Sequence, residues 1–364
     1  MEVRAAVLYE PHQPLSVERL QLADHGPGEV LVRIVGSGVC GSDLHAVDGE
    51  LPIQLPSVLG HEAAGVVEAV GADVRTVAPG DLVVLAWTPG CGRCPTCWNG
   101  RPRECPHLLA GRDDLEDGQT RLSHNGVAIH HMSHIAGFAE YAVVGERTCV
   151  KVREDAPLEK ICLVGCCVAT GYGAVFGNAK VEPGSSAVVI GCGGVGLNVI
   201  QALDLALATT IIAVDIVDVK LDMARAFGAT HTINATDADT VDAVREIVGE
   251  AGADYAFEVI SLARTIEQAF EFTRRDGTLV VVGLPLPWDA TISIPASPWK
   301  TVTSAFPTGT QWQNTPLLVD LYMAGKLKLD ELISRERPLD DVNAAFDELR
   351  TGAIARTVLL PSSS

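Results

Sequence analysis

Basic residues are scarce in this 364-residue chain, where 27 Lys and Arg side chains oppose 46 Asp and Glu side chains and give a formal net charge of −19. An acidic surface of that size repels phosphate backbones and anionic lipid heads, so binding to nucleic acid or to a membrane surface is disfavoured. Aromatic residues make up only 5% of the chain, but 47% of its residues are hydrophobic, too many for a disordered protein. The length indicates two domains.

A secretory leader and a membrane span are also missing from the pattern. Met1–Tyr9 alternates like a short strand and has no basic start followed by an apolar run. The longest uncharged stretch, Ser185–Leu203, has the length of a membrane span but contains four glycines together with Asn198 and Gln201. We therefore expect a cytoplasmic chain whose ten cysteines stay reduced, where close cysteine spacing indicates metal before disulfide.

The chain divides into three stretches of different pattern. Residues 1 to about 150 carry short alternating runs separated by Pro-Gly turns, which is typical of β structure with little helix. From about residue 163 to 306, apolar runs alternate with helical periodicities, which predicts a parallel sheet covered on both faces. The remainder predicts helices at Pro316–Ala324 and Leu339–Thr351 and a final strand that packs back on the first stretch.

Four closely spaced cysteines form the strongest motif, with the spacing C-x2-C-x2-C-x7-C at Cys91, Cys94, Cys97 and Cys105. Four thiolates so close in sequence can converge tetrahedrally on one Zn²⁺, and the intervening glycines and prolines supply the tight turns. An iron–sulfur cluster is the main alternative, but the ferredoxin run has its fourth cysteine after three residues rather than seven. With no open ligand position, such a zinc site is structural.

A second candidate metal set is dispersed along the chain, at Cys40, His61 and Cys166. A catalytic zinc takes three protein ligands and leaves a fourth position open, and two cysteines with one histidine are one such set. Asp43 is placed to hold His61 through its second ring nitrogen, and Glu62 is a further nearby carboxylate. The spacing alone leaves open that the two cysteines are buried small hydrophobic residues and that the histidine is a core residue.

Two polar residues follow the first of these cysteines. Ser42 and His45 offer a hydroxyl and an imidazole near any metal bound at Cys40, and such a pair can pass a proton outward from a metal-bound substrate. The alternative is a turn serine and a surface histidine.

A glycine fingerprint follows the first apolar strand of the middle stretch. Gly191-Cys192-Gly193-Gly194-Val195-Gly196 fits G-x-G-x-x-G and opens a helical pattern, as a dinucleotide-binding turn requires. The glycines let backbone amides approach a pyrophosphate at the helix N-terminus. Asp215 ends the next predicted strand, Thr210–Asp215, where a carboxylate binds the adenosine ribose hydroxyls and repels a 2′-phosphate, so NAD is favoured over NADP.

Together these motifs resemble the zinc-dependent medium-chain alcohol dehydrogenases over nearly the whole chain. The most specific pieces are Gly60–Val74, which fits the family's zinc signature, the four-cysteine segment, and Gly165–Val175. The resemblance implies an α/β protein in which a GroES-like, β-rich catalytic domain is combined with a Rossmann doubly wound parallel sheet. The implied divisions are a first catalytic part at 1–167, an NAD-binding domain at 168–306 and a return to the catalytic domain at 307–364.

The resemblance also implies roles for single residues. The residues matching the catalytic machinery are the zinc ligands Cys40, His61 and Cys166, the supporting carboxylates Asp43 and Glu62, and the proton relay Ser42 and His45. Cys167 is then a bystander. The residues matching coenzyme contacts outside the fingerprint glycines are Thr170, Val195, Asp215, Lys220 and Arg356. Two Zn²⁺ per chain and NAD are the implied cofactors, and the implied chemistry is zinc-assisted hydride transfer from an alcohol to NAD.

Two departures from the family pattern bear on the coenzyme and the substrate. Gly41 stands where many members have Arg or His, so one pyrophosphate contact is missing. The branch that oxidises a glutathione adduct of formaldehyde binds glutathione through an acidic residue and an arginine. Here Leu51, with Glu50 beside it, and the arginine-free Cys105–Ala110 disfavour that branch.

The substrate is expected to be a primary alcohol with an aryl or alkyl body. The pocket candidates by resemblance are bulky and apolar, although several are equally suited to a core: Leu51, Trp87, Met132, Leu284 and Phe306. The His-rich segment Leu108–Ile135 fits a solvated loop beside the active site better than a third metal site.

Two alternatives to an NAD-releasing alcohol dehydrogenase remain. A nicotinoprotein keeps NAD bound and passes electrons to an external acceptor, and its motifs would look almost the same. A non-enzymatic nucleotide sensor on the same fold would be expected to have lost the dispersed metal ligands, which are all present here. The family resemblance implies a homo-oligomer, either a dimer or a tetramer.

Overall fold

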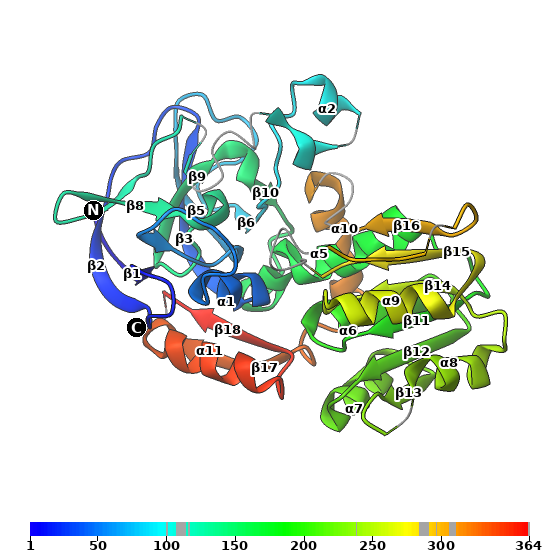
Figure 1. Cartoon of the computed structure of the whole chain (residues 1–364). Helices are drawn as coiled ribbons and strands as arrows, with labels where there is room; N and C mark the ends of the chain where they lie inside the picture. Colours follow the sequence, from blue (N-terminus) through cyan, green and yellow to red (C-terminus); the bar gives the residue numbers. More distant parts are fainter. Residues whose placement is uncertain are drawn as a thin grey trace. The chain divides into compact units, whose positions relative to one another are not determined.

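The computed structural model describes residues 1–99, 101–106, 114–115, 117–237, 239–283, 291–295, 297–305 and 311–362. The chain splits into two compact units, coloured along the sequence in Figure 1. The first unit comprises Met1–Cys166, Gly309–Thr351 and Arg356–Ser364, and the second comprises Cys167–Thr308 with Gly352–Ala355. The first unit is therefore built from segments far apart in the sequence.

The first unit is rich in β structure. A closed barrel has the strand order β1 (Glu2–Leu8), β2 (Ser16–Leu22), β7 (Leu122–His124), β8 (Val127–His131) and β4 (Ser57–Val58). A second sheet has the order β10 (Cys149–Lys151), β6 (Leu82–Leu85), β5 (Glu62–Val70), β3 (Glu29–Val39), β18 (Arg356–Leu360) and β17 (Ile333–Pro338), and β9 (Tyr141–Gly145) also pairs with β3. The alternating runs seen in the sequence thus form antiparallel strands with one buried face.

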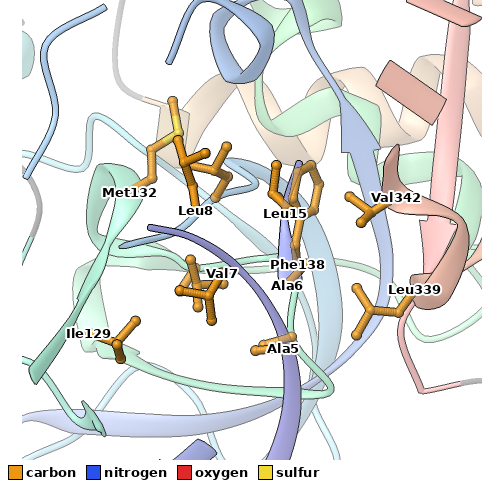
Figure 2. Packing of buried hydrophobic residues seen from close by; sticks show 14 of the residues in the cluster. Ala5, Ala6, Val7, Leu8, Leu15, Ile129, Met132, Phe138, Leu339 and Val342 are labelled. Atoms are coloured by element: carbon orange, nitrogen blue, oxygen red, sulfur yellow. The ribbon is translucent and has the colours of Figure 1, made fainter. Parts of the chain in front are cut away.

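Short helices connect these strands. They are α1 (Gly41–Val47), α2 (Pro95–Trp98), α4 (Leu158–Ile161), α10 (Gln311–Met323) and α11 (Val342–Thr351), together with the 3-10 turns η1 (Pro102–Glu104), η2 (Met132–His134), η3 (Glu146–Thr148), η4 (Cys162–Gly165) and η6 (Leu339–Asp341). Figure 2 shows part of the core of this unit, where Val7 and Leu8 from β1 lie near Ile129 and Phe138. The C-terminal segment contributes Leu339 and Val342 to the same cluster.

The second unit contains a six-stranded parallel sheet. Its order is β13 (His231–Asn234), β12 (Thr210–Asp215), β11 (Ser186–Ile190), β14 (Ala253–Glu258), β15 (Thr273–Val281) and β16 (Thr301–Ser304). The order in which successive strands are added therefore reverses at β11, and the carboxyl ends of β11 and β14 flank this switch point. The predicted parallel sheet is confirmed.

Helices cover this sheet in two groups. The helices are α5 (Cys167–Tyr172), the π-helical η5 (Gly173–Ala179), α6 (Gly194–Leu205), α7 (Asp218–Phe227), α8 (Thr240–Val248) and α9 (Ala263–Phe272). Contacts join α6 to α7 and α8 to α9. The crossovers through α6 and α7 run from β11 toward β13, and those through α8 and α9 run in the opposite direction, from β13 toward β15. Because such crossovers are right-handed, the two pairs cover opposite faces of the sheet (Figure 1).

One predicted helix begins earlier than its sequence pattern indicates. Pro316 was expected to open a helix ending at Ala324, but α10 starts at Gln311 and Pro316 lies inside it. The prediction was wrong because proline is commonest in the first helical turn, whereas here side-chain contacts of Gln311 and Trp312 hold the preceding turn in place.

Within the described ranges, no single helix is long and apolar enough to cross a membrane. Among the same residues, one bent pair passes the test by length and composition, Leu158–Gly165 with Cys167–Ala179.

Candidate active site

The four-cysteine site is assembled by a tight loop, the short helix α2 and the turn η1. The sulfur atoms of Cys91, Cys94, Cys97 and Cys105 all lie within 4.8 Å of one another, and all four residues are buried. The Sγ atoms of Cys94 and Cys105 are 3.8 Å apart, which matches the edge of about 3.8 Å expected for tetrahedral ligands about 2.3 Å from zinc. The residues present fit a closed, structural Zn²⁺ site.

The thiols of this site differ in acidity, because burial raises the pKa of Cys97 to about 12. The backbone N–H of Cys97 lowers the pKa of the Cys94 thiol to about 6, and the N–H of Cys91 donates to Cys105 Sγ at 3.3 Å. Gly92 has φ +66°, and a Cβ there would overlap with the guanidinium of Arg147, so this cation lies directly against the loop. Arg147 went unnoticed in the sequence, because only the fold brings it beside the cysteines.

The dispersed metal ligands converge in the first unit. Ligand atoms of Cys40, His61, Glu62 and Cys166 lie within 4.8 Å of one another, and all four residues are buried. The pairing of β3 with β5 explains part of this convergence, because Gly38 faces Glu62 across the two strands and so brings the end of β3 beside the start of β5. Cys166 arrives separately, at the end of η4.

Asp43 organises this cluster from a fully buried position on α1. Its Oδ2 accepts the N–H of Cys40 at 3.1 Å, and its Oδ1 accepts the N–H of Gly60 at 3.0 Å and lies 3.2 Å from His61 Nδ1. Occupying Nδ1 leaves Nε2 of His61 for a metal. Burial opposes a charged ring, but the Asp43 carboxylate raises the pKa of His61 well above its ordinary value.

Neighbouring groups and burial shift the pKa values of the thiol and carboxyl groups in this cluster. The hydrogen bond with Cys166 and, further, the charge of Arg356 hold the pKa of the Cys40 thiol well below its ordinary value. Burial raises the pKa of Glu62 to about 7. The two thiols and the imidazole fit a Zn²⁺ with an open fourth position, and Glu62 is a further carboxylate close to the same point.

Arg356 lies next to the candidate metal ligands Cys40 and Glu62. It is only 4% exposed, its Nε is 3.5 Å from Glu62 Oε2, and its Nη2 is 3.8 Å from Cys40 Sγ. A buried cation here compensates the negative charge of the thiolate and the carboxylate. The pyrophosphate contact implied for Arg356 stays an expectation.

The residues proposed as a proton relay share helix α1 with Asp43. Ser42 and His45 are half-buried, and the Nδ1 of His45 is 2.7 Å from Glu50 Oε2. That contact leaves the Nε2 of His45 available to exchange a proton.

The proposed pocket residues fall in different places. The Trp87 ring lies edge-on to the His61 ring, with centroids 6.3 Å apart and an interplanar angle of 79°. Leu51 packs against the first unit's core, and Met132 lies within that core at 2% exposure, as Figure 2 shows. Leu284 and Phe306 lie outside the described residues.

The glycine fingerprint joins β11 to α6 in the second unit. Gly191 has φ +95°, and a Cβ on Gly196 would overlap with the carbonyl oxygen of Gly191, so the turn requires glycine at both positions. Gly193 is the N-cap of α6, and Gly194 and Val195 begin the helix, so its first amides point toward the turn.

Asp215 lies beside this turn at the end of β12. Its Oδ2 accepts the N–H of Cys192 at 2.8 Å and lies 4.0 Å from Lys220 Nζ, while its Oδ1 accepts the N–H of Ile216 at 2.8 Å. Thr170 lies in α5 and is 8% exposed. The exposed side chains of Ile216 and Ile260 add apolar surface next to the turn, suited to a flat base.

No third metal cluster emerges from the part of the chain that the structure describes. His130 Nδ1 pairs with Asp114 Oδ1 at 2.9 Å, and His131 is fully buried with its pKa lowered to about 3 by desolvation. Only the two groups above bring three or more potential ligand atoms close together among these residues.

Comparison with known proteins agrees with this geometry. The alcohol dehydrogenase GroES-like domain family matches residues 26–154, and the zinc-binding dehydrogenase family matches residues 194–314. An S-(hydroxymethyl)glutathione dehydrogenase of Paracoccus denitrificans is 41% identical over 379 aligned positions, covering 99% of this chain and all of the relative.

Two solved structures are similar over 99% of both chains. An alcohol dehydrogenase zinc-binding domain protein from Burkholderia ambifaria has a TM-score of 0.94 at 38% identity. A benzyl alcohol dehydrogenase from Acinetobacter calcoaceticus has a TM-score of 0.93 at 33% identity. The predicted fold class, a GroES-like domain with a Rossmann sheet, is confirmed.

Proposed function

Because the chain belongs to the zinc-dependent medium-chain alcohol dehydrogenases, we propose that it oxidises a primary alcohol to an aldehyde with hydride transfer to NAD, and catalyses the reverse reaction. One observation carries this proposal: the ligand atoms of Cys40, His61 and Cys166 lie close together in a buried cluster, and Asp43 holds the ring of His61. Zinc bound by these residues would supply a Lewis acid that lowers the pKa of the alcohol.

The protein's own groups then manage orientation and the proton. Asp43 fixes His61 and the backbone of Cys40 together, so two ligands keep a constant separation during the reaction. Ser42 Oγ is proposed to take the hydroxyl proton and His45 Nε2 to pass it outward, with Glu50 holding the opposite ring nitrogen. NAD, bound through the glycine turn, Asp215 and Lys220, would accept the hydride.

An aryl alcohol is our preferred substrate class. The Trp87 ring beside His61 offers an aromatic edge close to the metal site, and a benzyl alcohol dehydrogenase is among the similar structures. The glutathione adduct of formaldehyde is the second candidate, because a relative 41% identical is named for it. Leu51 and its neighbour Glu50 argue against this candidate, since a single acidic side chain recognises glutathione incompletely.

A substrate and acceptor panel on zinc-replete protein tests the proposal. NADH formation would be followed with aliphatic and benzylic alcohols and with S-(hydroxymethyl)glutathione, and in parallel with a nitroso acceptor and no added NAD. Free NADH with a benzylic alcohol supports the proposal. Turnover only with the nitroso acceptor would instead show that NAD never leaves, which is the nicotinoprotein alternative.

The coenzyme preference gives a separate prediction. Asp215→Asn is expected to lower the preference for NAD over NADP by about 10- to 100-fold, because a charged hydrogen bond to the ribose and the repulsion of a 2′-phosphate are both lost. The amide oxygen can accept the N–H of Cys192 or those of Ile216 and Val217 but not both, so the unfolding midpoint is measured alongside. The ratio of kcat/KM for the two coenzymes measures the effect, with exposed Asp222→Asn on α7 as control. An unchanged ratio would contradict the role of Asp215.

We place the protein in the cytoplasm as a homo-oligomer, either a dimer or a tetramer. None of the ten cysteines, all of them among the described residues, forms a disulfide, which suits a reducing compartment. Strand β16 ends the sheet with mostly exposed residues, including Val302 at 42% exposure, and so offers an edge to a second copy.

A further inference from the structure

The side chain of Gln311, at the first residue of α10, makes three buried hydrogen bonds. It is 2% exposed. Its Oε1 accepts the backbone N–H of Thr88 at 3.0 Å and the hydroxyl of Thr88 at 2.8 Å, and its Nε2 donates to the carbonyl oxygen of Gly165 at 2.8 Å. One side chain therefore joins three segments that are far apart in the sequence.

Chemistry fixes the orientation of this amide. A backbone N–H can only donate, so the atom facing Thr88 N must be the amide oxygen. A backbone carbonyl can only accept, so the atom facing Gly165 O must be the amide nitrogen. Carboxylate, hydroxyl and thioether side chains each lack either the donor or the geometry to satisfy both ends, which explains why a glutamine fits this position.

Both ends of the amide reach segments of the proposed active site. Gly165 directly precedes the zinc ligand Cys166, and Thr88 directly follows Trp87, whose ring lies against His61. Cys166 lies between η4 and α5 with φ −137° and ψ −75°, so helical hydrogen bonding does not hold its backbone in a regular turn. Its own N–H makes a long hydrogen bond, 3.4 Å, to Leu163 O.

We propose that Gln311 is a positioning residue for the catalytic zinc. It holds the sulfur of Cys166 at ligand distance from the metal, and it keeps the Trp87 ring beside His61. Cys40 directly follows β3 and His61 directly precedes β5, and these two strands pair with each other, whereas Cys166 follows η4. The turn η4 packs on β3, β5 and β6, and Gln311 adds a direct hydrogen bond to the carbonyl group of the residue that precedes the third ligand. This inference deepens the proposed function and rests on it.

A merely structural role makes a different prediction. If Gln311 only stabilises the fold, its removal lowers the unfolding midpoint but leaves the metal site of the folded protein as it was. If it positions Cys166, the folded protein itself binds metal differently, because thiolate distance and angle set the ligand field. Cobalt(II) in place of zinc reports this directly through its d–d and thiolate charge-transfer absorption.

The test compares Gln311→Met with the matched control Gln313→Met, which makes the same change at an exposed position of the same helix. Measurements are made well below the unfolding transition. For Gln311→Met we expect shifted cobalt bands, about tenfold weaker metal binding at the catalytic site in chelator competition, and about tenfold lower kcat with an unchanged KM for NAD. Gln313→Met should behave like the wild type in all three.

Unchanged cobalt bands and metal affinity in folded Gln311→Met would overturn the proposal. Should that variant fail to fold, Gln311→Asn serves instead, because the shorter amide keeps its chemistry but cannot span Thr88 and Gly165 together; unchanged bands there overturn the proposal equally. The cobalt readout needs no substrate. A wild type that oxidises no alcohol would refute the proposed function, whereas the metal-binding result would still decide the role of Gln311.

Discussion

Cys40→Ala is expected to lower kcat/KM for alcohol oxidation on the order of 1,000-fold or more and to remove one of two zinc ions per chain. Cys40 supplies one of the two thiols of the dispersed set, and the remaining His61, Cys166 and Glu62 give an incomplete site. The loss exceeds the 10- to 100-fold effect of removing a supporting hydrogen bond, because the ligand itself is absent. Zinc content and steady-state kinetics on the same preparation measure both consequences.

The variant also leaves a buried cation with one partner fewer, since Arg356 Nη2 lies 3.8 Å from Cys40 Sγ. Some loss of stability is therefore expected, and unfolding must be followed alongside activity. Cys167→Ala is the matched control: it removes a fully buried thiol next to the ligand Cys166, and its activity should stay within about twofold of wild type. Full activity in Cys40→Ala, or inactivity with two zinc ions in Cys167→Ala, would contradict the ligand assignment.

Local sequence patterns sufficed for most of the second unit. The strand Thr210–Asp215 was predicted with its observed bounds, because a buried parallel strand is a continuous apolar run that needs no knowledge of its neighbours. The fingerprint glycines were equally easy to identify, since their spacing is typical of the turn between a strand and a helix. The sequence also predicted that Asp43 would hold His61, and the structure places the two in contact.

What the sequence could not show are contacts that depend on the fold alone. In the sequence Gln311 is a polar residue a few positions before Pro316, where a helix was expected to begin, and nothing distinguishes it from other polar residues. Its side chain nevertheless reaches Thr88 and Gly165, more than 140 positions away. Arg147 likewise meets the four-cysteine loop only through tertiary structure. Such contacts have no periodicity and no fixed spacing, so a pattern in one sequence carries no trace of them.

Cys105→Ala is expected to release the structural zinc and to lower the free energy of unfolding by about 3 kcal/mol or more. Structural zinc sites contribute directly to folding, and three thiolates cannot close the tetrahedron. Cys105 is fully buried and is the fourth ligand, brought in by η1. Zinc content should fall from two to one per chain, and urea unfolding measures the loss; the control Cys149→Ala removes another fully buried thiol, in β10, without loss of zinc.

The effect of Cys105→Ala on catalysis should be smaller than its effect on stability. Released thiolates no longer attract Arg147, whose Nε donates to Gly90 O at 2.8 Å and whose carbonyl oxygen accepts the indole N–H of Trp312 at 2.9 Å. Trp312 follows Gln311 on α10, and Trp87, whose ring lies beside His61, precedes the four-cysteine loop in the chain, so loosening the loop reaches the catalytic zinc indirectly. We expect protease to cleave the four-cysteine loop readily, and the activity per folded molecule to fall several-fold. Abolished activity in fully folded Cys105→Ala would instead mean that the four-cysteine site takes part in the chemistry.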